Sequence, residues 1–319
     1  MKNNTVCLLG GTGFVGYHLA NRLTHHGYMV NILTRRRERH RELLVNPAIR
    51  IIETDVYNND QLRRNFCGAG AVINLIGILN ERNAKQDSFA RIHAELPGLI
   101  AAAAAAVGVP RLLHMSALHA DPAEPHSRYL KTKGEGEDRA HAAANRDLRV
   151  TSFRPSVIFG PGDSFFNRFA ALLKLSPLFF PLACPDSRFA PVYVGDVAEA
   201  FSTALTDEAT SGQRLELCGP DSYTLKELVV YTRDTIGLEK PVIGLGDKLS
   251  RWQARLLGML PGRPFSMDNY YSLQHDSLCT DNALPALGIT PTTVKTVVPT
   301  YIAGRNQRER YHAFRRTAH

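Results

Sequence analysis

The chain has 319 residues, of which 44% are hydrophobic and 21% are charged, so it can bury a full core and its composition argues against disorder. Its formal net charge of +8 favours anionic partners such as phosphorylated ligands or anionic lipid. We expect no nucleic-acid partner, because the sequence contains no aromatic-basic platform and no groove-reading motif.

Strand and helix signals alternate through the first half of the chain. Short apolar runs that end in turn residues predict strands, and apolar residues at helical spacing predict helices. The predicted strands are Thr5–Leu9, Tyr28–Thr34, Arg50–Thr54, Ala71–Ile76, Arg111–Ser116 and Arg149–Phe153. The predicted helices are Phe14–His26, Asp87–Val107 and Tyr129–Asn145. This alternation predicts an α/β fold, with a doubly wound parallel sheet covered by helices on both faces.

The second half of the chain is less regular. Six prolines within residues 155–191 indicate loops around short helices, and we expect Val192–Leu205 and Arg214–Cys218 to return to the sheet. From Thr224 onward, helical segments and loops predict a smaller α+β lobe. The expected organisation is a large domain over residues 1–160 that is completed by about 190–220, a small lobe over 161–189 and 221–305, and a basic tail over 306–319.

The cysteines and the N-terminus indicate the compartment. The cysteines are far apart and show no CxxC or Cys/His ligand spacing: Cys7, Cys67, Cys184, Cys218 and Cys279. Such cysteines are typical of free or buried thiols in a reducing compartment, and they indicate no metal site. An apolar strand begins almost directly after Met1, which leaves no room for a signal peptide, and no apolar run reaches the ~18–20 residues of a membrane span. We therefore expect a cytoplasmic protein.

A glycine-rich turn links the first strand to the first helix. It has the GxxGxxG spacing of a Rossmann dinucleotide fingerprint. Gly10 permits the tight turn, Gly13 lets the backbone approach a pyrophosphate, and Gly16 lets the helix sit against the strand. The helix N-terminus then offers amide donors and a partial positive charge to the anion. The alternative is a turn without a ligand, but the flanking strand and helix favour a dinucleotide site. Its expected members are Gly10, Thr12, Gly13, Phe14, Val15 and Gly16.

Residues at the ends of the next strands indicate which dinucleotide binds. An NAD site normally has an acidic residue at the end of the second strand, where this chain has Arg35 and Arg36. These arginines could pair with a 2′-phosphate, or they could belong to a solvated arginine run. We favour NADP(H) and keep NAD(H) as the alternative. Residues after the third and fourth strands are expected to line the cofactor: Asp55, Val56, Asn74 and Gly77.

Tyr129 and Lys133 form a candidate acid–base pair. They lie four residues apart, and on a helix this spacing puts them on one face. A cation beside a phenol lowers the pKa of the phenol, so the tyrosine can exchange a proton near neutrality, and the lysine can also hold the nicotinamide ribose. A surface helix turn is the alternative. The position after the fifth strand of a dinucleotide fold favours the catalytic interpretation.

Four segments together resemble the extended short-chain dehydrogenase/reductase family. They are Gly10–Gly16, the Tyr129/Lys133 pair, Arg154–Asp163 and Pro191–Ala198. The resemblance covers nearly the whole chain and implies NAD(P) binding, with Pro155 and Val157 at the cofactor. Other details are most similar to an atypical branch, which contains the NADPH-binding accessory subunit of respiratory complex I and its bacterial relatives. These details are His114–Leu118, Ser127–Leu130 and Gly162–Phe169.

Several positions depart from the sugar-modifying members of that family. Where those enzymes have a Ser or Thr that polarises the substrate hydroxyl, this chain has Leu118, which forms no side-chain hydrogen bond. Ser116, 13 residues before Tyr129, is a second candidate for that role, or it caps the end of the strand. His93 replaces a usual asparagine and is expected to be packed rather than to act as a base. Phe189 stands where an arginine anchors the sugar nucleotide, so we expect intact cofactor binding and eroded sugar-nucleotide recognition.

The lobe contains one amphipathic helix, Lys248–Leu260. Leu249, Trp252 and Leu256 recur at helical spacing with arginines beside them. We expect this apolar face to pack on a core, and the alternative is a surface helix on a membrane or a partner. The basic tail after Arg305 is expected to be disordered and to be attracted weakly to anionic lipid.

Three functions are consistent with these features. The first is an NADP(H)-dependent oxidoreductase that acts on a carbonyl or alcohol of unknown identity through Tyr129 and Lys133. The second is a nucleotide-sugar epimerase or dehydratase, against which Leu118 and Phe189 count. The third is a non-catalytic, cofactor-stabilised accessory or assembly protein of a respiratory complex, peripheral to the inner face of a membrane. The fold alone does not choose among them.

Overall fold

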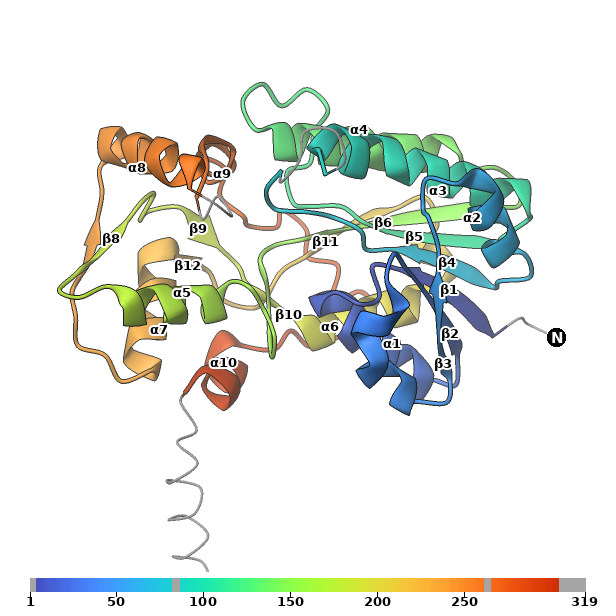
Figure 1. The fold of residues 1–319 in the computed structure, drawn as a ribbon, viewed down its shortest axis with the longest axis horizontal. Coiled ribbons are helices and arrows are strands. Elements are labelled where there is room, and N and C mark those ends of the chain that lie inside the picture. The colour runs from blue at the N-terminus through green and yellow to red at the C-terminus, as the bar shows by residue number, and fades with distance from the viewer. Residues whose placement is uncertain (1–3, 82–86, 261–264, 304–319) are drawn as a thin grey trace, which may run out of the picture.

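The computed structural model describes residues 4–81, 87–260 and 265–303, and Figure 1 shows their arrangement. Its centre is a seven-stranded parallel sheet with the order β11-β6-β5-β4-β1-β2-β3. The strands are β1 (Thr5–Leu9), β2 (Met29–Thr34), β3 (Ile49–Glu53), β4 (Ala71–Asn74), β5 (Arg111–Met115), β6 (Arg149–Pro155) and β11 (Arg214–Leu217). The strand order reverses between β1 and β4, which is where dinucleotides bind in folds of this class.

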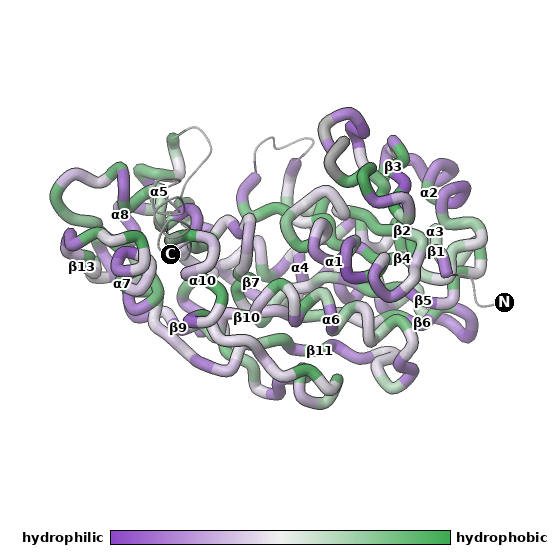
Figure 2. Tube along the Cα trace, turned by 90° about the horizontal axis from the view of Figure 1, so that it is seen from below, coloured by the Kyte–Doolittle hydropathy of each residue, from purple (hydrophilic) through white to green (hydrophobic). Residues whose placement is uncertain are grey.

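Helices cover both faces of the sheet, so the predicted α/β doubly wound class is confirmed. Side chains of β1 alternate between the two faces: Val6 and Leu8 pack with α1 (Phe14–His25) and α6 (Val194–Ala204), whereas Cys7 and Leu9 face the other layer. That layer contains α2 (Asn59–Phe66), α3 (Leu96–Ala106) and α4 (Arg128–Ala142). Figure 2 shows hydrophobic colour along the interior strands and hydrophilic colour in several outer turns.

The long helix predicted over Asp87–Val107 is present in two parts, a π-helical segment (Ala90–Glu95) and α3. The alanine run lies inside α3, and Ala101, Ala103 and Ala104 are fully buried. Small residues on α4 allow an equally close approach, because a Cβ at Gly136 would lie 1.7 Å from the carbonyl oxygen of His93. The short side chains therefore bring α4, which carries the candidate acid–base pair, close to its neighbours.

A smaller lobe is built from short two-stranded sheets and helices, chiefly from the C-terminal part of the chain. Its strands are β7 (Ile158–Phe159), β8 (Phe180–Leu182), β9 (Arg188–Phe189), β10 (Val192–Tyr193), β12 (Tyr223–Thr224) and β13 (Val242–Gly244). Its helices are α5 (Phe166–Leu175), α7 (Leu225–Thr235), α8 (Asp247–Met259), α9 (Met267–Ser272) and α10 (Val294–Ile302). Short helical turns also occur at η1 (Arg37–Val45) and η3 (Glu208–Thr210). The lobe has its own apolar core, which includes Phe159, Phe166 and Val298.

One of the two expectations for the second half is confirmed and the other is wrong. Arg214–Leu217 returns to the sheet as β11, but Val192–Leu205 does not. Only Val192 and Tyr193 form a strand, which pairs with β7, and the following residues form helix α6. The physical reason is the spacing of Val197, Phe201 and Ala204, which places their apolar side chains on one side of a helix against the main core.

The expectation that all five cysteines are thiols is wrong. Cys218 and Cys279 form a disulfide, and only Cys7, Cys67 and Cys184 are free. The two bonded residues lie 61 positions apart in the sequence, but the fold brings the end of β11 against the segment that follows α9. No spacing rule could identify such a pair, because the contact exists only in the folded chain.

The amphipathic helix of the lobe also differs from expectation. The sequence predicts a core-facing apolar side over Lys248–Leu260, but Leu249, Trp252 and Leu256 of α8 are exposed.

The basic tail lies outside the described residues. Within the described part of the chain, no helix is both long and apolar enough to cross a membrane.

Candidate functional site

The glycine turn lies at the carboxyl end of β1. Gly10 adopts a left-handed conformation with φ of +78°, and a Cβ there would lie 3.0 Å from the backbone carbon of Leu75. A Cβ at Gly16 would lie 2.3 Å from the carbonyl oxygen of Gly10, so only glycine lets α1 start directly against the turn. At Gly13 a Cβ would meet only that same oxygen, at 3.3 Å, and the rest of its surroundings are open. Gly13 therefore leaves a free approach to the backbone.

The first turn of α1 has features that favour binding of an anion. Gly13 is the N-cap residue, no side chain caps the helix, and its first turn, which includes Phe14 and Val15, contains no acidic residue. The first amide N–H groups of a helix have no partner within the helix, and their positive partial charge attracts phosphate. Thr12 lies in the same turn. An uncapped helix start behind an open glycine fits the pyrophosphate of a dinucleotide.

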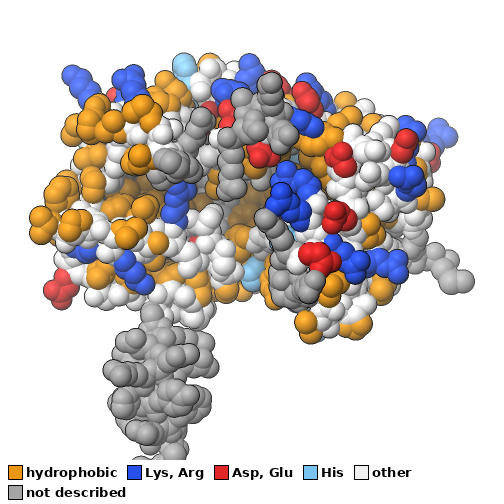
Figure 3. All heavy atoms as spheres, viewed as in Figure 1, with side chains coloured by type: hydrophobic (Ala, Val, Ile, Leu, Met, Phe, Trp, Pro, Cys, Tyr) orange, Lys and Arg blue, Asp and Glu red, His pale blue; other side chains and the backbone are white. Residues whose placement is uncertain are grey.

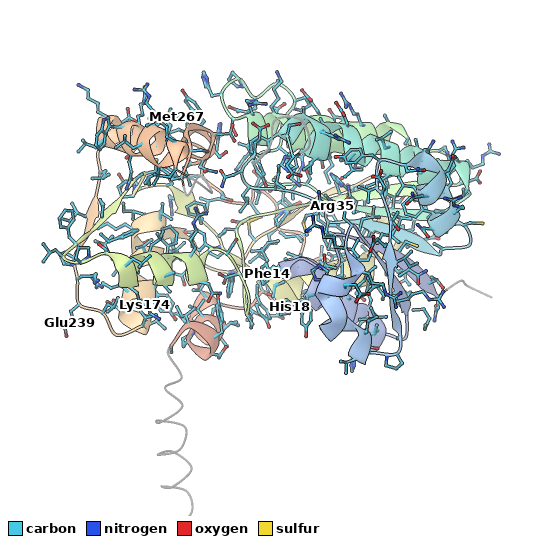
Figure 4. The ribbon with its side chains drawn as sticks, viewed as in Figure 1. Phe14, His18, Arg35, Lys174, Glu239 and Met267 are labelled. Carbon is cyan, nitrogen blue, oxygen red and sulfur yellow. A yellow bond between two sulfur atoms is a disulfide. The ribbon has the colours of Figure 1, made fainter. Side chains whose placement is uncertain are left out.

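Arg35 follows β2 at the same edge of the sheet, and Figure 4 shows it above Phe14 on the side that faces the lobe. Its side chain is 79% exposed and lies 3.6 Å from the carboxylate of Asp87. Arg36 is also exposed, and its backbone N–H donates to Thr34. An exposed guanidinium near the glycine turn is free to turn toward a phosphate group, because an exposed ion pair at this distance holds it only weakly.

The residues predicted after β3 and β4 serve the fold through identified contacts. The carboxylate of Asp55 accepts a hydrogen bond from the backbone of Tyr57, and Val56 is buried. Asn74 is buried, and its side chain contacts His114 and accepts from the backbone of Ile76. These contacts fix the loops around the turn.

Gly77 connects the cofactor side to the acid–base pair. A Cβ at Gly77 would lie 3.5 Å from the ammonium nitrogen of Lys133 and 3.6 Å from the ring nitrogen Nε2 of His93. Glycine at this position keeps open the space beside Lys133. The turn after β4 and helix α4 therefore border the same region of the molecule.

Tyr129 and Lys133 both lie on α4, in accordance with their four-residue spacing. Lys133 is buried, and its ammonium donates to the carbonyl oxygen of Met115 at 2.8 Å. Burial lowers the pKa of Lys133 to about 8, although the nearby Glu137 carboxylate opposes this effect. Burial raises the pKa of the Tyr129 phenol to about 12, and the Asp268 carboxylate acts in the same direction. The expected lowering of that phenol's pKa by Lys133 is therefore absent from this structure.

Ser116 has a partner other than Tyr129. Its hydroxyl donates to the carboxylate of Glu137 at 3.2 Å. Glu137 is fully buried and also accepts hydrogen bonds from Arg154, at 2.7 Å for the shortest, while Arg214 lies 3.5 Å away. Glu137 is one helical turn after Lys133, but no local pattern indicates its role, because its partners lie just after β5 and in β6 and β11.

His93 is packed, as the sequence predicted. Its ring stacks on Phe89 with centroids 5.2 Å apart and meets the edge of Tyr129 at 5.3 Å. Its Nε2 accepts the backbone N–H of Ile78 at 3.0 Å, so this nitrogen carries no proton. Burial lowers the pKa of His93 to about 2, and the charge of Lys133 adds to the effect. A neutral, stacked histidine positions the Tyr129 ring.

The two positions that the sequence analysis compared with substrate-contacting residues are apolar. Leu118 is buried with Ala190 and with the Cys218–Cys279 disulfide. Phe189 is buried in the core of the lobe. Pro155 ends β6, and its carbonyl accepts a backbone hydrogen bond from Leu118, which follows β5. The carbonyl of Val157 accepts one from Val192 of β10.

Helix α9 of the lobe contacts the start of α4, which the sequence did not predict. The Asp268 carboxylate accepts the backbone N–H of Arg128 at 2.6 Å and that of Tyr129 at 3.2 Å. The hydroxyls of Ser127 and Ser272 lie 2.8 Å apart. The lobe therefore holds the backbone of the candidate catalytic tyrosine directly.

In the described residues no group of His, Cys, Asp and Glu is arranged to hold a metal ion.

This geometry agrees with the comparisons of the chain with known proteins. The model of the NAD dependent epimerase/dehydratase family matches residues 6–218. The chain belongs to this family. Among similar proteins, the mitochondrial subunit 9 of the NADH dehydrogenase [ubiquinone] 1 alpha subcomplex of Mus musculus is 29% identical over 302 residues, which are 90% of this chain and 77% of that protein. The ceramide reductase of Caulobacter vibrioides is 29% identical over 247 residues, which are 76% of this chain and 74% of that protein.

Solved structures show the same fold. The structure of MoeE5 in complex with UDP-glucose and NAD superposes with a TM-score of 0.72 at 21% identity, over 93% of this chain and 97% of that one. The family membership and this likeness establish a dinucleotide-binding fold of the short-chain dehydrogenase/reductase type, of the epimerase/dehydratase kind.

Proposed function

We propose that this protein is an NADP(H)-dependent oxidoreductase that acts on a carbonyl or alcohol, with Tyr129 and Lys133 as its acid–base pair. The observation that carries the proposal is the position of Lys133. Its buried ammonium lies beside Gly77, one helical turn from Tyr129, at the edge of the sheet where the glycine turn opens. This is where the reactive end of a dinucleotide would meet a proton donor.

The chain's own contribution is proton transfer and positioning. A bound nicotinamide supplies or accepts the hydride. During carbonyl reduction, the Tyr129 phenol gives its proton to the carbonyl oxygen, and in the reverse direction it takes that proton back. A pKa of about 12 keeps the phenol protonated at neutral pH but makes it a weak acid, so the bound cofactor and Lys133 must lower this pKa before the proton can be transferred. Lys133 would hold the nicotinamide ribose and stabilise the phenolate that remains. The reductase name of the Caulobacter relative supports this reaction class.

Arg35 supports the preference for NADP(H) over NAD(H), with Arg36 as a second arginine beside it. Replacement of Arg35 by Asp removes a phosphate partner and adds repulsion, so NADPH affinity should fall by at least about tenfold, whereas NADH affinity should change little. The measurement is a fluorescence titration of both cofactors. Arg50→Asp is the matched control, because Arg50 lies near the amino end of β3, away from the glycine turn. An equal fall for both cofactors in Arg35→Asp would contradict the assignment.

A second candidate function is that of a non-catalytic, cofactor-stabilised accessory protein peripheral to a respiratory complex. The similarity to a mitochondrial NADH dehydrogenase subunit over 90% of the chain favours it, as do the engagement of Ser116 with Glu137 and the apolar surroundings of Leu118. The same buried Leu118 and Phe189 make a nucleotide-sugar epimerase or dehydratase the weakest candidate.

The deciding experiment compares two variants. Tyr129→Phe should keep dinucleotide affinity and lower turnover on carbonyl substrates by roughly 10²–10⁴-fold, because only the transferable proton is lost. Gly13→Val should abolish dinucleotide binding, because its branched side chain fills the open approach to the turn. If Tyr129→Phe supports growth or respiration as well as the unchanged protein while Gly13→Val does not, the accessory function replaces the reductase.

A further inference from the structure

Helix α8 presents its large apolar residues to solvent. Trp252 is 61% exposed and Met259 is 75% exposed, and Leu249 and Leu256 are exposed with them. These four residues fall within an arc of about 80°, because an α-helix turns by about 100° per residue. We call them the α8 stripe. A continuous exposed apolar stripe on one helix marks an interaction surface more often than isolated exposed residues do.

The opposite side of α8 explains why the stripe faces outward. Small residues occupy that side: Ser250 and Ala254 are buried, and Gly258 follows one turn later. The Ser250 hydroxyl accepts the backbone N–H of Cys184, so the helix backbone lies close to the lobe. Because α8 docks through its small residues, the bulky residues have no place in the core.

A second exposed apolar group lies at the same end of the lobe. It consists of residues at the end of α5 and in the turn before β8, where Leu175 and Leu178 are 79% and 77% exposed and Phe179 is also exposed. Figure 3 shows hydrophobic side chains gathered along this left-hand end, from α8 at the top toward the α5–β8 turn below. Both groups lie at the end of the lobe remote from the nucleotide-binding sheet (Figure 1).

The charges that border this end are mainly basic. Lys248 and Arg255 lie on one flank of the α8 stripe, within about 60° of it, and Lys174 borders the lower group (Figure 4). Among the described residues, no acidic side chain forms an ion pair with any of these three. The one acidic residue of α8, Asp247, is bound by Arg251 and by the Tyr270 hydroxyl, and Glu239 is the exposed acid near Lys174. The border therefore favours a negatively charged partner.

We propose that the α8 stripe and the α5–β8 turn dock this protein on the surface of an anionic lipid bilayer. An amphipathic helix with aromatic and aliphatic residues on one face and Lys or Arg beside it binds in the plane of a membrane interface. Its apolar face enters the headgroup–acyl boundary, and each basic residue near the surface adds attraction to anionic headgroups. The net charge of +8 acts in the same direction. This docking is independent of whether the dinucleotide site performs chemistry.

The other occupant to consider is a second copy of the chain. Two α8 stripes that face each other would bring together Lys248 and Arg255 of both copies, and like charges across an interface are unfavourable. A bilayer with anionic headgroups satisfies the apolar stripe and the basic border together, so the charge pattern favours lipid.

Trp252 makes the proposal directly measurable, because it is the only tryptophan in the chain. The full chain is titrated with vesicles of phosphatidylcholine alone and with vesicles that also contain phosphatidylglycerol. We expect a blue shift of Trp252 emission and co-sedimentation with the anionic vesicles, and both effects should weaken at high salt, which screens the basic border. Absence of any shift with anionic vesicles overturns the proposal.

Two variants test which residues are responsible. Leu256→Glu should strongly reduce co-sedimentation, whereas Val45→Glu, an equal change at an 86% exposed position on the nucleotide-binding domain, should not. The double variant Lys248→Glu/Arg255→Glu should weaken binding to the anionic vesicles by at least about fivefold for each basic residue removed. The control, Arg63→Glu/Arg64→Glu on α2, should weaken vesicle binding much less. If the two members of either comparison bind equally, general charge or hydrophobicity is the cause and the proposal fails. Dimers in analytical ultracentrifugation that Leu256→Glu dissolves would instead assign the stripe to a second copy.

Discussion

The two halves of the candidate site differ in how their polar groups are used. On the cofactor side, the start of α1 has no side-chain cap, Gly13 is open, and Arg35 is exposed. On the acid–base side, two polar groups already have partners within the protein: Lys133 donates to Met115 and Ser116 donates to Glu137. Tyr129 is half-buried. One half is open to a charged ligand, whereas in the other half Lys133 and Ser116 are buried and hydrogen-bonded.

This difference has a consequence for reactivity. The pyrophosphate of a dinucleotide can bind at the open side without displacing a side chain from the start of α1. Lys133 has three N–H donors and gives one to Met115, so it can hold the nicotinamide ribose and keep that bond. A substrate that uses the Ser116 hydroxyl as a donor must first replace the Glu137 carboxylate, and this exchange costs about 1–3 kcal/mol unless the new partner is equally good. Pyrophosphate binding should therefore tolerate changes at Ser116 and Glu137, and the following predictions depend on that independence.

The largest effect is expected at Glu137, which lies beneath the acid–base pair. Its side chain is fully buried between Arg154 and Arg214. Glu137→Gln should lower the free energy of unfolding by about 3–5 kcal/mol, because it leaves partly buried arginines without their counter-charge. Urea denaturation measures this change. In the fraction that remains folded, NADPH affinity should stay within about twofold, because the glycine turn belongs to the other half and distant sites act independently.

An exposed ion pair supplies the control for Glu137. Glu208→Gln removes the same charge from a pair with Arg149, in which the glutamate side chain is 80% exposed, and such pairs contribute about 0–1 kcal/mol. Equal destabilisation by the two substitutions would show that Glu137 has no special role. A large loss of NADPH affinity in folded Glu137→Gln would show that the two halves are coupled.

The open half could be predicted from the sequence because its signals are local. The glycines, the strand before them and the helix after them all lie within Thr5–His25, and each glycine has one geometric reason to be there. The Tyr129/Lys133 pair is local too, since it depends only on helical spacing. The partners of that pair are not local: Asp268 lies 139 positions from Tyr129, and a spacing rule carries no information about such a contact.

The lobe was harder to predict for a related reason. Apolar residues at helical spacing indicate that α8 is amphipathic, but they do not say which side faces the protein. That choice depends on Ser250, Ala254 and Gly258, whose small size lets α8 approach Cys184 and Ser266 closely. The Cys218–Cys279 disulfide is a further case, because it depends on where the segment after α9 meets β11.

The smallest effect is expected at Asp268, where the lobe contacts the acid–base half. Its carboxylate accepts the backbone N–H groups of Arg128 and Tyr129, and burial raises the pKa of Asp268. Asp268→Asn keeps one acceptor oxygen and loses the charge, so the free energy of unfolding should fall by only about 1 kcal/mol. Asp221→Asn is the control, because that carboxylate is exposed and accepts only from Tyr223 among the described residues.

Asp268→Asn should also change the acidity of Tyr129, and the direction is fixed by charge. The Asp268 carboxylate helps to raise the pKa of the Tyr129 phenol to about 12, because a negative charge disfavours the phenolate. Removal of that charge should lower this pKa, so the phenol should titrate at a lower pH than in the unchanged protein. NMR of labelled tyrosine rings measures the titration, and the resonance lost in Tyr129→Phe identifies the residue. A pKa of Tyr129 that stays the same or rises would mean that the lobe holds the backbone of Tyr129 without acting on its proton. The reductase would then depend on cofactor binding alone to make the phenol reactive.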